Sequence, residues 1–87
     1  MTTLLFPVFR KYKNDKSYFK IEDPQSFEEI NIMGKSFTII RHTAKILPDR
    51  NLLMDMLYDY HTYWDEITAN EYADKLQLCR KTLREII

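Results

Sequence analysis

In residues 8–13 and again in residues 17–22, the side chains fall into two sets at alternate positions, as the two faces of a strand require. An alternation with a period of two is typical of β-strands, because successive side chains point to opposite faces. The intervening Asn14-Asp15-Lys16 favours a turn, since Asn and Asp tolerate left-handed backbone and bond their own backbone. These segments together predict a β-hairpin.

Two further strands are predicted over residues 27–33 and 36–46, separated by the only glycine of the chain, Gly34. Glycine at this point supplies the positive φ of a tight turn. In the second of these strands the apolar phase changes between Ile39 and Ile40. The change indicates either a β-bulge or a strand that is buried on both faces.

The periodicity changes after Pro48, and an amphipathic helix is predicted over residues 50–63, with Asp49 as its N-cap. The apolar side chains of this segment share one arc of a helical wheel: Leu52, Leu53, Met56, Leu57, Tyr60, Tyr63 and Trp64. We expect the three aromatic members of this set to anchor the helix to its neighbours.

A second helix is predicted over residues 69–85, and its start carries the clearest local signal in the sequence. Thr68 and Glu71 have the spacing of a capping box, in which the threonine caps the helix and the glutamate bonds back to it. Ile67 and Tyr72 flank this box in the positions of a hydrophobic staple. Both pairs place the first turn of the helix at the same residues.

These elements predict an α+β fold in one domain that spans residues 1–87. Strands over residues 8–46 would form a four-stranded antiparallel sheet, either as two hairpins or as a meander. The two C-terminal helices are expected to pack on one face of this sheet, because layering one apolar face on another buries both.

Composition narrows the functional classes. Thirteen Lys and Arg balance thirteen Asp and Glu, so no overall field attracts the protein to nucleic acid or to an anionic membrane. A single cysteine excludes an intramolecular disulfide, and no apolar run approaches the roughly 20 residues of a membrane span. The N-terminal residues make a poor signal peptide. We therefore expect a cytoplasmic protein with no membrane partner.

Residues with catalytic or metal-binding chemistry are few and scattered. His42 and His61 are the only histidines, and they lie on different predicted elements without the spacing of a zinc site. We expect His42 to be partly buried and hydrogen-bonded, and His61 to lie near a helix C-terminus. Cys79 falls on the apolar stripe of the second helix and is expected to be a core residue. The sequence predicts no catalytic residue, cofactor or metal, which leaves an enzyme of unidentified type as a lesser alternative.

A protein–protein interaction module is the function that the sequence favours, with the protein itself or another protein as partner. Met54 and Tyr58 fall outside the apolar arc of the first helix, with His61 close by in angle, and Met and Tyr are enriched at interfaces. These three residues form the candidate interface of a possible homodimer. The same ridge could instead pack inward if the sheet wraps around the helix.

A weak single-stranded nucleic-acid-binding face is the alternative hypothesis. Basic residues punctuate the predicted strands, and aromatic rings beside them could stack on bases. The candidate residues of this face are Lys11, Lys13, Tyr18 and Lys20. Lysines on strands also serve to prevent edge-to-edge aggregation, and the balanced charge of the chain is unlike that of a typical nucleic-acid module.

Overall fold

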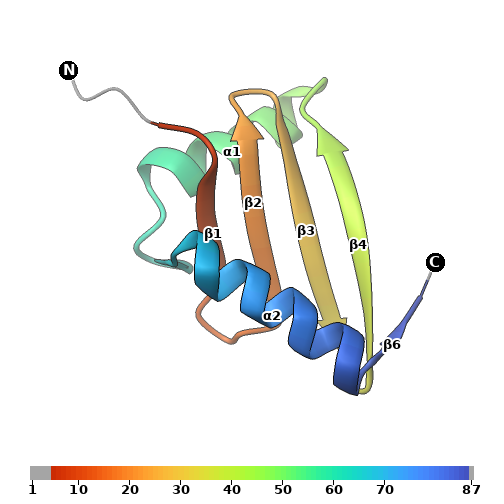
Figure 1. The fold of residues 1–87 in the computed structure, drawn as a ribbon. Helices are drawn as coiled ribbons and strands as arrows, with labels where there is room; N and C mark the ends of the chain where they lie inside the picture. The colour runs from red at the N-terminus through yellow and green to blue at the C-terminus, as the bar shows by residue number, and fades with distance from the viewer. Residues whose placement is uncertain (1–4, 87) are drawn as a thin grey trace.

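An antiparallel meander of four strands is the centre of the fold, as a computed structural model of residues 5–86 describes it (Figure 1). The strands are β1 (Val8–Tyr12), β2 (Ser17–Asp23), β3 (Ser26–Met33) and β4 (Ser36–Thr43). Each pairs with the next along the chain, which is the meander rather than two separate hairpins. The predicted α+β class and antiparallel sheet are confirmed.

Two short strands extend this meander to six strands in the order β5-β1-β2-β3-β4-β6. β5 (Trp64–Glu66) runs antiparallel to β1, and β6 (Arg84–Glu85) runs parallel to β4. The sequence predicted neither strand. With three and two residues, they are too short to show an alternating pattern.

The turns of the meander follow the predicted chemistry. Asp15 has a φ of 61°, and the Asn14 side chain accepts a hydrogen bond from the backbone N–H of Lys16 at 2.9 Å. Gly34 has a φ of 60° at the first central position of the β3–β4 turn. This is the geometry of a type II′ hairpin turn, which favours glycine there.

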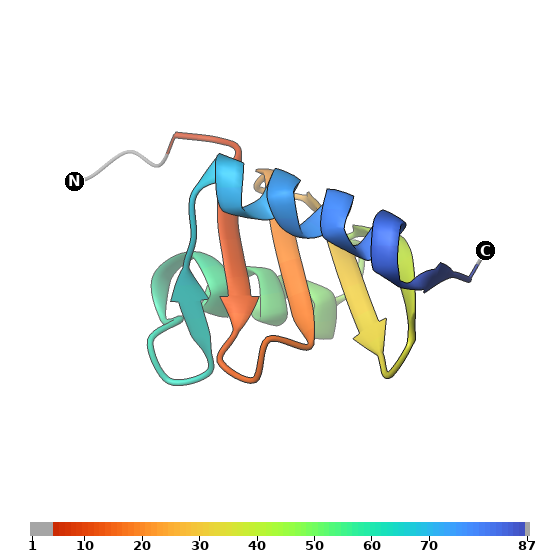
Figure 2. The same cartoon turned by 60° about the horizontal axis from the view of Figure 1, so that its bottom comes forward.

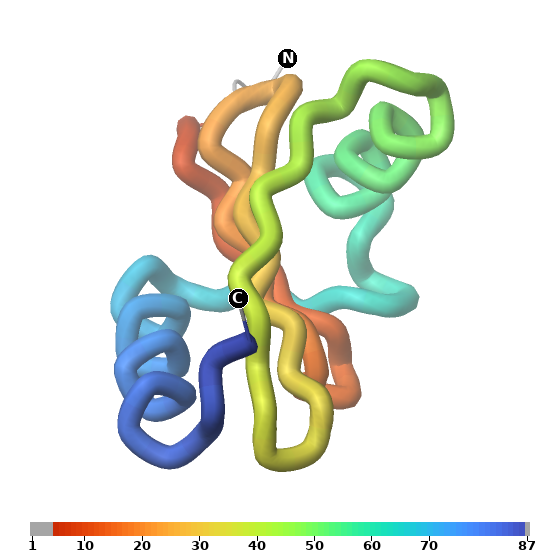
Figure 3. Tube along the Cα trace, turned by 90° about the vertical axis from the view of Figure 1, so that its right-hand side faces the viewer, coloured from red at the N-terminus to blue at the C-terminus, as the bar shows by residue number. Residues whose placement is uncertain are grey.

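The helices α1 (Leu47–Tyr58) and α2 (Ala69–Thr82) lie on opposite faces of the sheet (Figures 2 and 3). The sequence prediction that both pack on one face is therefore wrong. The physical reason lies in the strands, which carry large apolar side chains on both faces and so need a cover on each side.

The core beneath α1 joins the sheet to the inner side of the helix. From the helix it contains Leu53, Met56 and Leu57, of which at most 4% is exposed. From the strands it contains Val8, Phe19, Ile21, Phe27 and Trp64. We call this set the α1-side core.

The core beneath α2 uses the alternate residues of the same strands. The buried members of this α2-side core are Tyr18, Ile30, Phe37, Ile67, Tyr72 and Cys79. Ile39 packs against it, and the β3–β4 register runs without a break past Ile39 and Ile40. The change of apolar phase in β4 is thus not a bulge: Ile39 and Ile40 point to opposite faces of the sheet, and both are partly buried.

The bounds of α1 differ from the predicted 50–63 at both ends. Ile46 is the N-cap, Pro48 lies in the first turn, and Asp49 is within that turn instead of capping it. Proline suits this position because its fixed φ is helical and its missing N–H would have no partner there. The helix ends at Tyr58, so that Tyr63 is 65% exposed and not an anchor, whereas Trp64 is buried in β5.

The start of α2 agrees with the prediction. The backbone N–H of Glu71 donates to the Thr68 hydroxyl at 3.1 Å, and Ile67 and Tyr72 share the α2-side core. The end differs, because the helix stops at Thr82 and not at residue 85. The residues that follow leave the helix to pair with β4.

The outer edge of β4 is only partly covered. The backbone N–H of Arg84 donates to the Lys35 carbonyl at 2.9 Å, and that of Ile86 donates to the Phe37 carbonyl at 2.8 Å. Past Phe37, this edge has no strand partner among residues 5–86.

Substitutions on the two sides of α1 should change the free energy of unfolding by different amounts. Leu53→Ala removes a side chain that is 2% exposed and should lower the free energy of unfolding by about 2–5 kcal/mol. Met54→Ala, one position along, removes a side chain that is 54% exposed and should change it by about 0.5 kcal/mol or less. Urea unfolding followed by circular dichroism measures both. Equal losses would contradict the described orientation of α1.

Candidate protein interaction surface

Three large apolar side chains lie in line on the outer side of α1. Leu47, Met54 and Tyr58 are 69%, 54% and 62% exposed. Their spacings of seven and four residues place them on one face of a helix with 3.6 residues per turn. Asn51, which is also exposed, fills the remaining position on this line. We call these four residues the α1 stripe.

Two opposite charges flank the α1 stripe. Arg50 lies along one side and Asp55 along the other, by their helical positions, and both are exposed. In the part of the chain that the structure describes, neither side chain takes part in an ion pair. The stripe is therefore an apolar line with one free cation and one free anion beside it.

The structure places the predicted interface ridge on the surface. Met54 and Tyr58 are exposed because the inner face of α1 already fills the α1-side core without them. His61 lies two residues beyond the C-cap of α1, so it is near the helix C-terminus as expected, but it is not on the helix and not in line with the ridge. It is exposed in the following loop, with its ring 4.2 Å from that of Tyr60.

The exposed apolar residue of α2 offers a contrast. Leu78 is 50% exposed, as expected from its position away from the helix's apolar side. It is the single large apolar side chain exposed within α2, and isolated exposed apolar residues are normal on protein surfaces. Exposed apolar residues that gather on one face, in contrast, are typical of interaction sites.

The positions of the candidate nucleic-acid-binding residues do not favour contact with a single strand. Tyr18 is 8% exposed beneath α2, with the Lys75 ammonium 5.3 Å from its ring centroid. Lys11 pairs with Asp15. Lys13 Nζ lies 3.0 Å from an Asp65 carboxylate oxygen, and Lys20 shares the α2 face with Tyr18 by strand alternation. A ring that could stack on a base is thus covered, and two of the three lysines have acidic partners.

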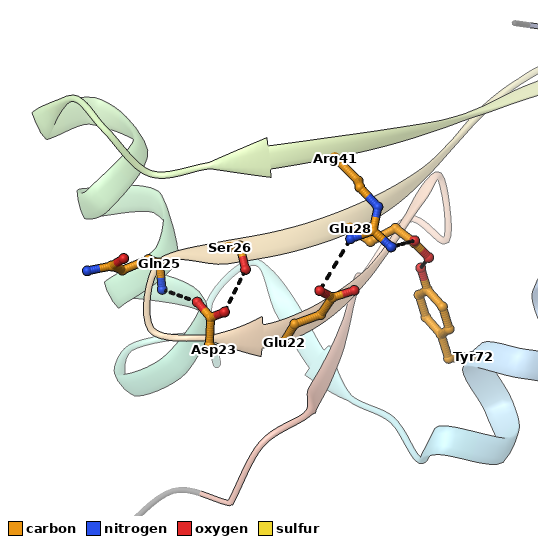
Figure 4. Close-up of polar contacts among 7 residues, drawn as sticks. All are labelled: Glu22, Asp23, Gln25, Ser26, Glu28, Arg41 and Tyr72. Atoms are coloured by element: carbon orange, nitrogen blue, oxygen red, sulfur yellow. Dashed lines mark hydrogen bonds and ion pairs between the residues drawn. The ribbon is translucent and has the colours of Figure 1, made fainter.

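A polar network attaches α2 to the sheet (Figure 4). The Tyr72 hydroxyl donates to a Glu28 carboxylate oxygen at 2.8 Å. The Arg41 guanidinium bridges Glu28 at 3.5 Å and Glu22 at 3.3 Å. Burial raises the pKa of Tyr72 well above its ordinary value, and the hydrogen bond to Glu28 adds to this shift. The network is a structural tie between α2 and strands β2, β3 and β4.

A second polar network lies on the α1 face of the sheet around Glu29. The Ser17 hydroxyl donates to this carboxylate at 2.9 Å, and His42 Nε2 lies 3.1 Å from it. The predicted partly buried, hydrogen-bonded His42 is confirmed. The carboxylate stands between the serine and the histidine, whereas a nucleophilic serine needs the imidazole at its hydroxyl. The register could have revealed this cluster, since Ser17 and His42 are diagonal neighbours of Glu29.

Arg10 is a buried structural residue that sequence reasoning missed. It is 4% exposed, and its Nε donates to the Met56 carbonyl at 2.9 Å. Its guanidinium lies 3.8 Å from the Tyr60 ring centroid and 3.9 Å from Glu66. Its place on the same strand face as Val8 was the signal that could have identified it.

The hollows of the surface contain little catalytic chemistry. Three of them, of about 380, 290 and 350 Å³, are lined by neither histidine. The largest lies between β1 and the start of α2 and includes Arg10, Glu66 and Glu71. Cys79 is 1% exposed, and burial raises the pKa of its thiol, which disfavours the reactive thiolate.

Residues 5–86 contain neither a metal-binding cluster nor a membrane-spanning helix. No three His, Cys, Asp or Glu side chains come close enough together there to hold a metal ion. Neither α1 nor α2 combines the length and the apolar character that crossing a bilayer needs.

Comparisons with known proteins add no relative to this picture. No family model matches the chain, and searches of the curated proteins and of the solved structures gave no match. The geometry of the described residues is therefore the basis of the functional proposal.

Because the pKa of the Tyr72 hydroxyl is raised in the folded chain, we expect the protein to lose stability at alkaline pH. The unfolded chain releases this proton near pH ~10, whereas the folded chain holds it to higher pH. The contribution is therefore complete below pH ~10 and is lost as the pH rises further. Urea unfolding between pH 8 and 11 should show a falling free energy of unfolding.

The control for this effect is the removal of one hydroxyl at a time. Tyr72→Phe should flatten the alkaline fall in part, because burial also raises the pKa of Tyr12 and Tyr18. Tyr63→Phe, which removes a hydroxyl from an exposed side chain, should leave the fall as it is in the wild type. A Tyr72→Phe curve that parallels the wild type would disprove the assignment.

Proposed function

We propose that this chain is a non-enzymatic protein–protein interaction module and that the α1 stripe is its docking surface. The observation that carries the proposal is the alignment of Leu47, Met54 and Tyr58 along the exposed side of one helix. Each of these side chains offers apolar surface whose removal from water is favourable by roughly 25 cal/mol per Å².

The support of α1 makes this surface suitable for docking. The inner side of the helix is held by Leu53, Met56 and Leu57 in the α1-side core, and Arg10 bonds the carbonyl of Met56. A helix fixed in this way loses little conformational entropy when a partner covers its outer side. The docking surface is thus already formed in the free chain.

The other hypotheses have weaker support from the geometry. Nucleic-acid binding through Lys11, Lys13, Tyr18 and Lys20 would require α2 to uncover Tyr18. An enzymatic function would require a hollow with titratable groups in catalytic contact. The Glu29 cluster offers neither a free nucleophile nor a place in one of the three hollows.

A site-specific photo-crosslinker in living cells tests the proposal without a known partner. The crosslinker replaces Tyr58 on the α1 stripe or, as the matched control, Leu78 on α2. We expect discrete adducts from position 58, because a docked partner covers it, and only background from position 78.

A second substitution shows whether the adducts depend on the stripe. Leu47→Glu with Met54→Glu should abolish them while the thermal unfolding midpoint stays close to that of the wild type, since both side chains are exposed. Equal adduct yields at positions 58 and 78, or adducts that survive the double substitution, would refute the proposal.

A further inference from the structure

We infer that the partner of the α1 stripe is a second copy of this chain, with the two α1 helices packed side by side and parallel about a two-fold axis. The inference rests on the proposed function, since it uses the same surface. Three features of α1 carry it: the spacing of the stripe, the charges beside it and the asparagine within it.

The spacing of the stripe is that of a coiled-coil contact line. Its residues follow one another at intervals of four, three and four, which is the alternation of d and a positions in a heptad repeat. In this frame Leu47 and Met54 are d residues, and Asn51 and Tyr58 are a residues. A helix with such a line packs against another helix with the same line at a small crossing angle.

The flanking charges are self-complementary in a parallel pair only. In the same frame, Arg50 is a g residue and Asp55 is the e residue five positions later. Parallel two-fold pairing brings each g residue beside the e residue of the other helix, so two Arg50–Asp55 ion pairs form. Antiparallel pairing sets flanks of the same kind together, which places Arg50 near Arg50 and Asp55 near Asp55. The charges therefore select the parallel arrangement.

Asn51 supports the same arrangement. A parallel pair brings the two Asn51 side chains face to face, where each amide can donate a hydrogen bond to the other and accept one. A single asparagine at an a position specifies register and a two-stranded pair, at some loss of stability. In an antiparallel pair each Asn51 would face Met54, and its polar groups would lie against an apolar side chain.

The area of the contact sets its strength. The apolar part of the stripe has three side chains per copy, so the interface falls below the ~1,200 Å² of stable complexes and belongs to the transient class. The opposite side of α1 is covered by its own sheet, with α2 beyond it (Figure 3), so in the pair the two α1 helices would lie between the two sheets. The expected dimer forms at high micromolar concentration.

Sedimentation equilibrium on the purified chain, from ~10 µM to ~1 mM, measures this association. Arg50→Glu or Asp55→Arg should each weaken it roughly tenfold, because two ion pairs become two repulsions. The double substitution, which exchanges the charges, should restore the wild-type constant. Leu78→Glu, on the other helix, should leave the constant unchanged. A double variant that stays as weak as the singles would overturn the parallel arrangement.

Disulfide trapping gives an independent measure of direction. Leu47→Cys places the new thiols side by side in a parallel pair and roughly 16 Å apart along the axis in an antiparallel one, at 1.5 Å per residue. Mild oxidation should give a covalent homodimer of Leu47→Cys, and the wild type, whose Cys79 is buried, serves as the blank. A product that forms only between Leu47→Cys and Tyr58→Cys chains would show antiparallel pairing and overturn the inference.

The two proposals fail in different ways. A chain that stays monomeric at ~1 mM, while position 58 still gives stripe-dependent adducts with other proteins in cells, overturns the second-copy inference and leaves the interaction module standing. A monomer that also lacks such adducts overturns both. Adducts between two copies of the chain, with the charge exchange restoring association, support both.

Discussion

The need to bury both faces of one sheet governs this molecule. Tyr18 and Phe19 are adjacent in β2, yet the first belongs to the α2-side core and the second to the α1-side core. Strands β1, β2 and β3 are shared in this way, so a slip of one residue would exchange the contents of the two cores. The strand register, the two helices and the two cores are therefore specified together, and each helix is held by residues from several strands.

The same division leaves the outer face of each helix free. Among residues 5–86, each helix contributes one side to a core, and no further element covers its other side. On α2 the outer face carries one large apolar side chain, Leu78, whereas on α1 it carries the line from Leu47 to Tyr58. The α1-side core does not use this line, because Leu47, Met54 and Tyr58 are exposed and lie outside that core. A feature that folding does not explain is the natural basis for a functional proposal.

Features that depend on neighbouring residues could be predicted from the sequence, whereas the positions of the helices relative to the sheet could not. Gly34 and Thr68 were predicted correctly because a tight turn and a helix cap depend on neighbouring residues. Trp64 was assigned to the apolar arc of the first helix, and its strand was missed, because that strand has three residues and depends on pairing with β1. The side of the sheet that each helix covers depends on the long-range path of the chain, which a periodic pattern does not record.

The candidate site, too, could be predicted from the sequence only in part. Met54 and Tyr58 could be identified from their helical angle, because a core arc on a helix also defines what lies outside it. Whether the ridge was exposed required the tertiary structure, since a curved sheet could have covered it. The contribution of Leu47 was hidden because the helix begins at that residue, before the predicted start at 50.

The partly open edge of β4 has a consequence for the behaviour of the protein at high concentration. Past Phe37 the strand consists of Thr38-Ile39-Ile40-Arg41-His42-Thr43, which has strong β-propensity and no proline. Arg41 lies within this stretch, and its side chain is 71% exposed. Two such edges that met in antiparallel fashion about Arg41 would set like charges opposite each other. A residue that ties α2 to the sheet thus also acts as a gatekeeper against the growth of the sheet from one molecule into the next.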